Sequence, residues 1–204
     1  MKKNIKQALV LTAICMMGFS SMLQAQSIYK IAYSKDADMK LSGTSTLHKW
    51  SMDAKTFAGD ARFGFKPGNQ NELASLKSLN FSLTVENLKS GESGLDNNAY
   101  KALQTKKYKD ISYKLQSATV SREKDNRYLL KTQGDLTIAG VTKAVSINVY
   151  CVVNEDATIT CTGSEKLNMT DYSVKPPSFM LGAMKTGDAI TLDFTLVYKK
   201  EQAI

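Results

Sequence analysis

The sequence predicts an all-β fold of about eight antiparallel strands with one short helix. Apolar and polar residues alternate in several segments, most clearly over residues 128–153, where two such arms flank Gly140. Breaks containing Gly, Pro or Asn separate these segments, and only residues 95–103 space their apolar side chains as a helix does. Many short strands joined by turns are typical of a barrel or of a sandwich, and the pattern alone does not separate the two.

An export signal precedes the predicted strands. Three lysines stand before an apolar run over residues 8–19 that ends in small and polar residues, which is typical of a secretory signal peptide (residues 1–25). We expect cleavage after Ala25, leaving one domain over residues 26–204 in the periplasm or outside the cell. A lipoprotein anchored through Cys15 is the weaker alternative, because Ile14 stands where a small residue is expected.

The charge of the processed chain is modest. The leader holds three of the 27 basic residues and none of the 19 acidic ones, so the remainder carries 24 − 19 = +5. The lysines are scattered over outward-facing strand positions rather than gathered, apart from those at 106, 107 and 109. This distribution argues against nucleic-acid binding and leaves at most peripheral contact with an anionic membrane surface.

The first third of the domain begins with a weakly alternating strand and loop over residues 28–39. An extended segment follows over residues 41–50, and then a strand over residues 57–65 whose apolar face mixes small and large side chains. Such a mixture suits the tapered interior of a barrel. Residues 66–69 form a break, and we expect a helical turn over residues 71–77.

The middle of the chain holds the clearest strand of the N-terminal half, over residues 79–86, and then a Gly-Ser linker over residues 90–94. In the predicted helix, residues 95, 99 and 103 are apolar and four apart, so they share one face. Either Asp96 or Asn97 could serve as its N-cap. A strand over residues 111–115 and a charged turn lead into the central hairpin.

Two cysteines remain after processing, Cys151 and Cys161. They flank a predicted turn at residues 154–157, and both lie on the apolar face of their strands. A cross-strand disulfide and two buried thiols are about equally compatible with this placement.

The stretch over residues 168–188 is long and lacks a regular period, and it contains Pro176, Phe179 and Met180. Apolar side chains on a loop must cover something, so we expect this segment to gate one end of the domain. The chain then closes with an alternating strand over residues 190–198.

Three motifs resemble the YceI-like family of periplasmic lipid-binding proteins. They are GTSTLHKW (residues 43–50), in the form of a divergent branch, NNAYKALQTKKY (97–108) and, most sharply, GDLTIAGVTKAV (134–145). The resemblance covers most of the processed chain. It implies a lipocalin-like antiparallel barrel that encloses an apolar tunnel for a long isoprenoid chain.

The alternating strands indicate which side chains would line such a tunnel. The predicted lining consists of inward-facing strand residues and two loop residues: Trp50, Phe63, Phe81, Leu83, Tyr113, Leu115, Leu136, Ile138, Ile147, Val149, Phe179, Met180 and Phe194. Each buried CH₂ of a ligand would contribute about 0.8 kcal/mol, so a polyprenyl chain or similar lipid could bind without specific hydrogen bonds. The alternative is that these side chains fill the interior, as in small barrels, and that the protein is a structural or protein-interaction module.

Catalysis and metal binding find little support in the sequence. His48 is the only histidine, and no nucleophile-elbow motif is present. Met169, Met180 and Met184 could suggest copper, but their spacing is irregular and no histidine accompanies them. We therefore expect a binding protein with no enzyme activity, no metal and no cofactor other than its lipid. Both a monomer and a homodimer remain open.

Overall fold

The computed structural model describes residues 27–32, 34–54, 56–124, 126–179 and 184–201. The predicted signal peptide, with Cys15 and its cleavage site at Ala25, lies outside the described residues, as does Met180.

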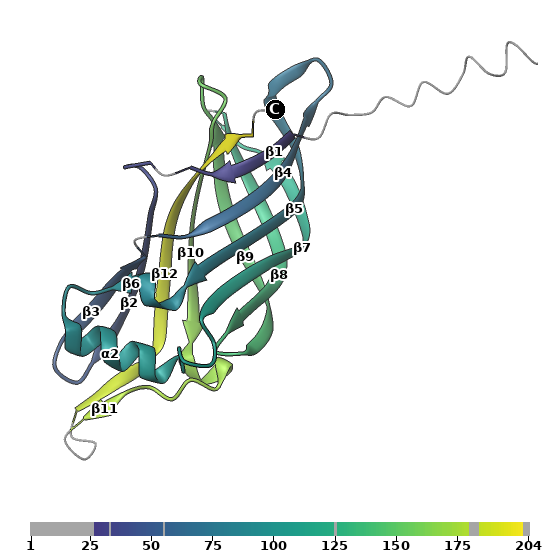
Figure 1. Cartoon of the computed structure of the whole chain (residues 1–204). Coiled ribbons are helices and arrows are strands. Elements are labelled where there is room, and N and C mark those ends of the chain that lie inside the picture. The colour runs from purple at the N-terminus through teal and green to yellow at the C-terminus, as the bar shows by residue number, and fades with distance from the viewer. Residues whose placement is uncertain (1–26, 33, 55, 125, 180–183, 202–204) are drawn as a thin grey trace, which may run out of the picture.

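Eight antiparallel strands pair in a closed ring, which confirms the predicted barrel (Figure 1). In spatial order they are β1 (Ser27–Ile31), β4 (Ala58–Lys66), β5 (Asn69–Thr84), β7 (Asp110–Arg122), β8 (Arg127–Ile138), β9 (Val141–Val153), β10 (Ile159–Asn168) and β12 (Met184–Lys200). Apolar residues alternate along these strands, so closing the ring turns one apolar face inward from every side.

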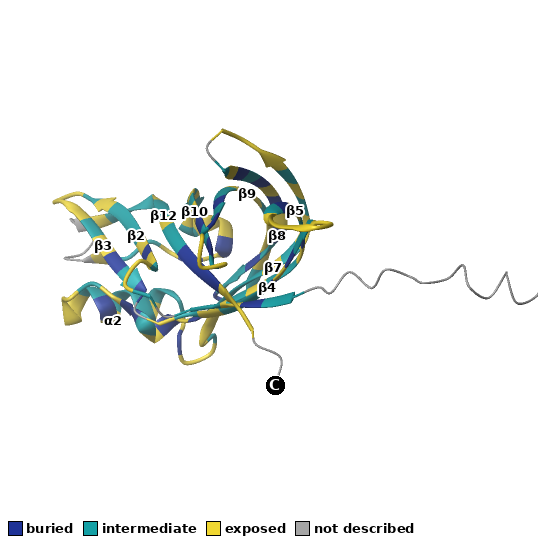
Figure 2. Ribbon diagram, turned by 90° about the horizontal axis from the view of Figure 1, so that it is seen from above, coloured by how far each residue is buried: buried dark blue, intermediate teal, exposed yellow. Residues whose placement is uncertain are grey.

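The ring is closed at one end only, because two strands share one edge of β12. The C-terminal part of β12 pairs with β1, for example Tyr198 with Ile31, whereas residues 186–195 pair with β2 (Asp38–Ser45). From β2 the sheet continues through β3 (Lys49–Ala54) to β6 (Leu88–Lys89). We call β2, β3 and β6 the side sheet. Figure 2 shows it set apart from the curved wall of β5, β7, β8 and β9.

The one α-helix of the described residues, α2 (Ser93–Ala102), covers the end of the barrel where the side sheet diverges (Figure 1). Its apolar residues Leu95 and Ala99 pack against the main core, as the four-residue spacing predicts. The predicted N-caps are wrong: Glu92 occupies the N-cap position, without a side-chain hydrogen bond. The helix therefore begins inside the predicted Gly-Ser linker. Among the described residues, no helix is long and apolar enough to span a membrane.

Polar contacts tie α2 to the segment that precedes it. The carboxylate of Asp96 accepts hydrogen bonds from the backbone N–H of Ser90 at 2.8 Å and from its hydroxyl at 2.7 Å. One turn later, the Tyr100 hydroxyl lies 2.8 Å from the carbonyl of Leu88, on β6. A short helix is marginal by itself, so these contacts and its apolar face hold it in place.

The predicted helical turn over residues 71–77 is wrong, because β5 runs through it as a strand. Leu73 and Leu76 are both buried although they are three apart, a spacing that is typical of a helix. The pairing explains it: Phe65 lies opposite Leu73 and Phe63 opposite Leu76, and the register shifts between them. The extra residue of this irregularity mimics a helical period.

The hairpin of β8 and β9 has the predicted turn. Ile138 pairs with Val141, and the two turn residues have positive φ, 48° at Ala139 and 79° at Gly140. A side chain at Gly140 would also overlap the ring of Tyr108, which follows α2. The glycine of the GDLTIAGVTKAV motif is therefore required both by its backbone conformation and by its close approach to the helix connection.

The closed end of the barrel is filled by aromatic side chains. The ring of Phe63 meets that of Tyr29 edge-on at 5.4 Å and that of Tyr198 at 5.5 Å. Tyr128 is 1% exposed and belongs to the same core. Free interior space is consequently confined to the middle of the barrel and to its open end.

Candidate functional site

An internal cavity of about 170 Å³ occupies the barrel. One water needs roughly 10–15 Å³ of such space, together with two to four polar partners. The cavity is thus large enough for many waters, yet its wall is almost wholly apolar. An apolar space of this size favours an apolar occupant over water.

Nine of the predicted ligand-binding residues line this cavity: Phe63, Phe81, Leu83, Tyr113, Leu136, Ile138, Ile147, Val149 and Phe194. Leu115 does not, although it lies in the same register as Tyr113 and packs against the core. Phe179 lies in β11 (Ser178–Phe179), a short strand paired with the start of β12, where we expected irregular chain. The position of its side chain, like the whole of Met180, lies outside what the structure describes.

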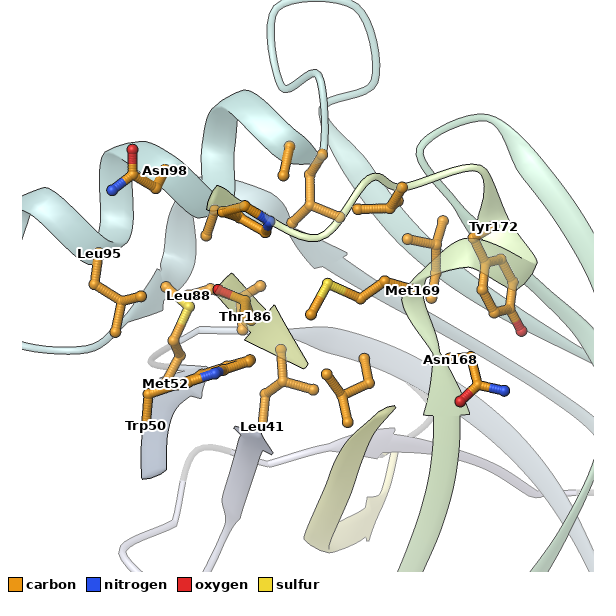
Figure 3. A pocket seen from close by; sticks show the side chains of 17 residues that line it. Leu41, Trp50, Met52, Leu88, Leu95, Asn98, Asn168, Met169, Tyr172 and Thr186 are labelled. Atoms are coloured by element: carbon orange, nitrogen blue, oxygen red, sulfur yellow. The ribbon is translucent and has the colours of Figure 1, made fainter. Parts of the chain in front are cut away.

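A second cavity of about 90 Å³, which we call the side pocket, lies between α2, the side sheet and the 3-10 helix η2 (Met169–Tyr172). Trp50, predicted for the barrel interior, lines this pocket instead. Figure 3 shows Met52 and Leu95 on one side, with Met169 reaching in from the other. The two cavities share five lining residues, and so they adjoin: Leu41, Leu88, Leu103, Ile138 and Ile190.

The segment predicted to act as a gate contributes to the side pocket. After β10 the chain supplies Met169, Tyr172, Val174 and Pro177 to its lining. Asp188 fixes the far end, because its carboxylate accepts hydrogen bonds from the Thr170 N–H at 2.9 Å and from the Thr170 hydroxyl at 2.6 Å. The irregular stretch is shorter than predicted, since strand structure reaches Asn168 and resumes at Met184.

Aromatic rings of both cavities lie over glycines of neighbouring strands. A side chain at Gly134 would overlap the ring of Tyr113, and one at Gly43 would overlap that of Trp50. Each glycine thus leaves room for a ring against the wall, where a larger residue would push it inward.

The two polar side chains on the β7–β9 wall, Tyr113 and Thr132, are both hydrogen-bonded within the wall. The Tyr113 hydroxyl donates to Thr132 Oγ1 at 3.3 Å, and the Thr132 hydroxyl donates to the carbonyl of Ile147 at 3.0 Å. Burial raises the pKa of Tyr113. Both hydroxyls donate their hydrogen bond within the protein, so this wall presents an effectively apolar surface to a ligand.

Two further polar side chains line the barrel cavity. The hydroxyl of Tyr198 is buried and has no hydrogen-bond partner among the described residues, and its burial strongly raises its pKa. Glu165 lies on β10, and desolvation by the surrounding protein raises the pKa of its carboxyl. Glu165 is not among the predicted lining residues, although it continues the inward alternation of Ile159 and Cys161.

Other lining residues missed from the sequence are aliphatic. Leu192 lies between Ile190 and Phe194 on the inward face of β12, and the alternation of that strand indicates it. Met39 and Leu41 were harder to find, because β2 alternates weakly.

The one histidine of the sequence lies apart from both cavities. His48 is exposed in the turn between β2 and β3, where its N–H donates to Ser45 Oγ at 3.2 Å, and it lines neither cavity. Nor do the described His, Cys, Asp and Glu residues form any group of three that could hold a metal ion.

Cys151 and Cys161 lie directly opposite each other on β9 and β10, with Cα atoms 4.2 Å apart, and are joined by a disulfide. Both line the barrel cavity and are buried. The bridge thus fastens two adjacent strands of its wall.

The comparisons with known proteins agree with this architecture. A family model described as YceI-like domain matches residues 33–198. A search of curated proteins finds no significant match.

Solved structures resemble the chain in fold at low sequence identity. A polyisoprenoid binding domain from Saccharophagus degradans, implicated in plant cell wall breakdown, is 11% identical with a TM-score of 0.64, covering 86% of this chain and 99% of that one. BcnA of Burkholderia cenocepacia is 17% identical with a TM-score of 0.60, covering 79% and 95%. A Campylobacter jejuni YCEI protein is 20% identical with a TM-score of 0.54, covering 74% and 85%.

Proposed function

Because the chain belongs to the YceI-like family, we propose that it is an exported, non-catalytic protein that binds a long hydrophobic chain, an isoprenoid or similar lipid, inside the barrel. The observation that carries this proposal is the apolar cavity of about 170 Å³ together with the adjoining side pocket. The polyisoprenoid-binding domain with the same fold supports the choice of ligand class.

The energetics favour a flexible hydrocarbon chain. Each buried methylene contributes about 0.8 kcal/mol, so ten of them exceed the several kcal/mol lost when a small molecule is immobilised. The lining supplies almost no hydrogen-bonding groups, and selection among chains would then rest on length and shape.

We place ligand access at the open end, between α2 and the segment that follows η2. The closed end is filled by Phe63 and its aromatic neighbours, whereas the side pocket leads from this open end to the barrel cavity. The segment from η2 to β12, including Phe179 and Met180, would act as the gate.

The test is native mass spectrometry of the protein purified from its own host, with organic extraction of the bound material. We expect an apolar compound to co-purify and to be lost from Val149→Trp, which places a bulky ring in the cavity. Asn148→Trp is the matched control, since the neighbouring Asn148 is exposed on the outer face. An empty wild-type protein that also takes up no added isoprenoid would instead support the structural or protein-interaction alternative.

A further inference from the structure

Glu165 is the only charged side chain among the described residues that line either cavity. Along β10 the residues alternate between the two faces of the strand: Ser164 and Lys166 are exposed, whereas Glu165 and Leu167 line the cavity. Its inward position follows from the register of the strand, so it is not a surface carboxylate that folds back.

The pairing with β12 places Glu165 near the junction of the two cavities. Glu165 pairs with Leu192, and the next inward pair toward the open end is Leu167 with Ile190. Ile190 lines both cavities. The carboxylate therefore stands where the barrel cavity meets the side pocket.

Within the described part of the chain, no cation balances this carboxylate. No described Lys or Arg forms an ion pair with Glu165, and none lines either cavity. Desolvation raises the pKa of the Glu165 carboxyl. The pKa of Tyr172 on η2 is also raised, chiefly by burial, then by the charge of Asp171 and last by the charge of Glu165. An anionic head group at the junction would thus meet a like charge and find no partner, although the protein as a whole is basic.

We propose that Glu165 sets the head-group specificity of the site, admitting lipids whose head is an uncharged hydrogen-bond donor or an amine and rejecting carboxylates and phosphates. The inference rests on the proposed function and names the ligand class within it. An ionised carboxylate is a hydrogen-bond acceptor only, so it is matched by an O–H or N–H donor. The hydrocarbon tail then occupies the barrel and the head lies at the junction.

The experiment compares ligands with one isoprenoid tail and different heads: geranylgeraniol, geranylgeranylamine and geranylgeranoic acid. Affinity is measured at pH 8 by displacement of the uncharged fluorophore N-phenyl-1-naphthylamine. For the wild type we expect the alcohol and the amine to bind about tenfold or more tightly than the acid, the size expected for two like charges a few ångströms apart in a partly screened site.

In Glu165→Gln the affinity for the acid should come to within about threefold of that for the alcohol, because the like charge is gone. In Glu165→Lys the acid should become the preferred ligand, because the charge at this position is now opposite to that of the acid. Asp193→Asn removes the same charge from the exposed face of adjacent β12, so it should keep the wild-type ratios.

The outcomes separate the two levels of the proposal. If the probes bind but Glu165→Gln keeps the wild-type ratios, as Asp193→Asn should, the head-group inference fails and the lipid-binding function stands. If neither the fluorophore nor any of the three lipids binds the wild type, the proposed function fails and the inference falls with it.

Discussion

The ring of Phe194 on β12 lies directly over Gly163 on β10, its partner across the strands. A side chain at Gly163 would overlap the far edge of that ring, so the glycine gives Phe194 its place against the cavity wall. The ring can relieve this overlap only by turning away from the wall into the cavity that it lines, which gives up its contact with β10.

We therefore expect Gly163→Ala to reduce the free energy of unfolding by about 1–3 kcal/mol, as overpacking does in a dense wall. Urea denaturation measures it. Gly94→Ala is the control: Gly94 lies in α2 with open space around its Cα, and alanine there should be neutral or stabilising by up to about 1 kcal/mol. Combining Gly163→Ala with Phe194→Leu should recover part of the loss. Equal effects of the two glycine variants would show that Phe194 does not constrain position 163.

The disulfide between Cys151 and Cys161 should stabilise the protein by about 2–3 kcal/mol, because it closes a short loop with a sequence separation of 10. Replacing both cysteines by alanine should lower the unfolding free energy by that amount. Thiol labelling of the unfolded, unreduced protein tests the bridge itself, since both cysteines are buried in the folded state. Labelling of both Cys151 and Cys161 would rule it out.

If the segment from η2 to β12 gates the cavity, substitutions in it should change the rate of ligand release and leave the fold unchanged. Replacing Phe179 and Met180 with Ser should speed the release of bound N-phenyl-1-naphthylamine severalfold and leave the melting temperature unchanged. The Asp188 contacts to Thr170 hold the ends of the segment in the variant as well. Leu47→Ser serves as a control, since Leu47 is 64% exposed at the turn of the side sheet. If release and melting both match the wild type, the segment does not gate the cavity.

Glu165 should make stability depend on pH. Desolvation raises the pKa of its carboxyl in the folded protein above the ordinary 4.5. The folded protein therefore binds this proton more tightly than the unfolded chain does. The stability that this proton contributes is complete below the pKa of Glu165 in the unfolded chain. It is lost as pH rises through the pKa of Glu165 in the folded protein. Thermal melts should thus show Glu165→Gln to be more stable than the wild type at pH 7 and equal to it below about pH 4. A difference independent of pH would mean that the carboxyl is solvated when folded.

Local sequence determined the strands, their inward faces and the β8–β9 turn. Alternation in β8 and β9 predicted correctly that Leu136, Ile138, Ile147 and Val149 share one dry face, since a period of two is sufficient to separate the faces of a strand. The same rule failed where a strand is irregular, because the bulged register in β5 imitated a helix. Alternation also does not distinguish an inward residue that packs in the core, such as Leu115, from one that lines the cavity.

Tertiary structure alone decided that the barrel is partly hollow, and where it opens. The volume enclosed depends on which strands close the ring, and this rests on β12 pairing with β1 at one end and with β2 at the other. It alone also placed Trp50 in the side pocket and Glu165 at the junction with the barrel. Alternation shows which side of a strand is dry, because burial is a local demand on each residue. Whether the dry sides meet or enclose space is set by pairings between residues far apart in the chain, for which no local pattern exists.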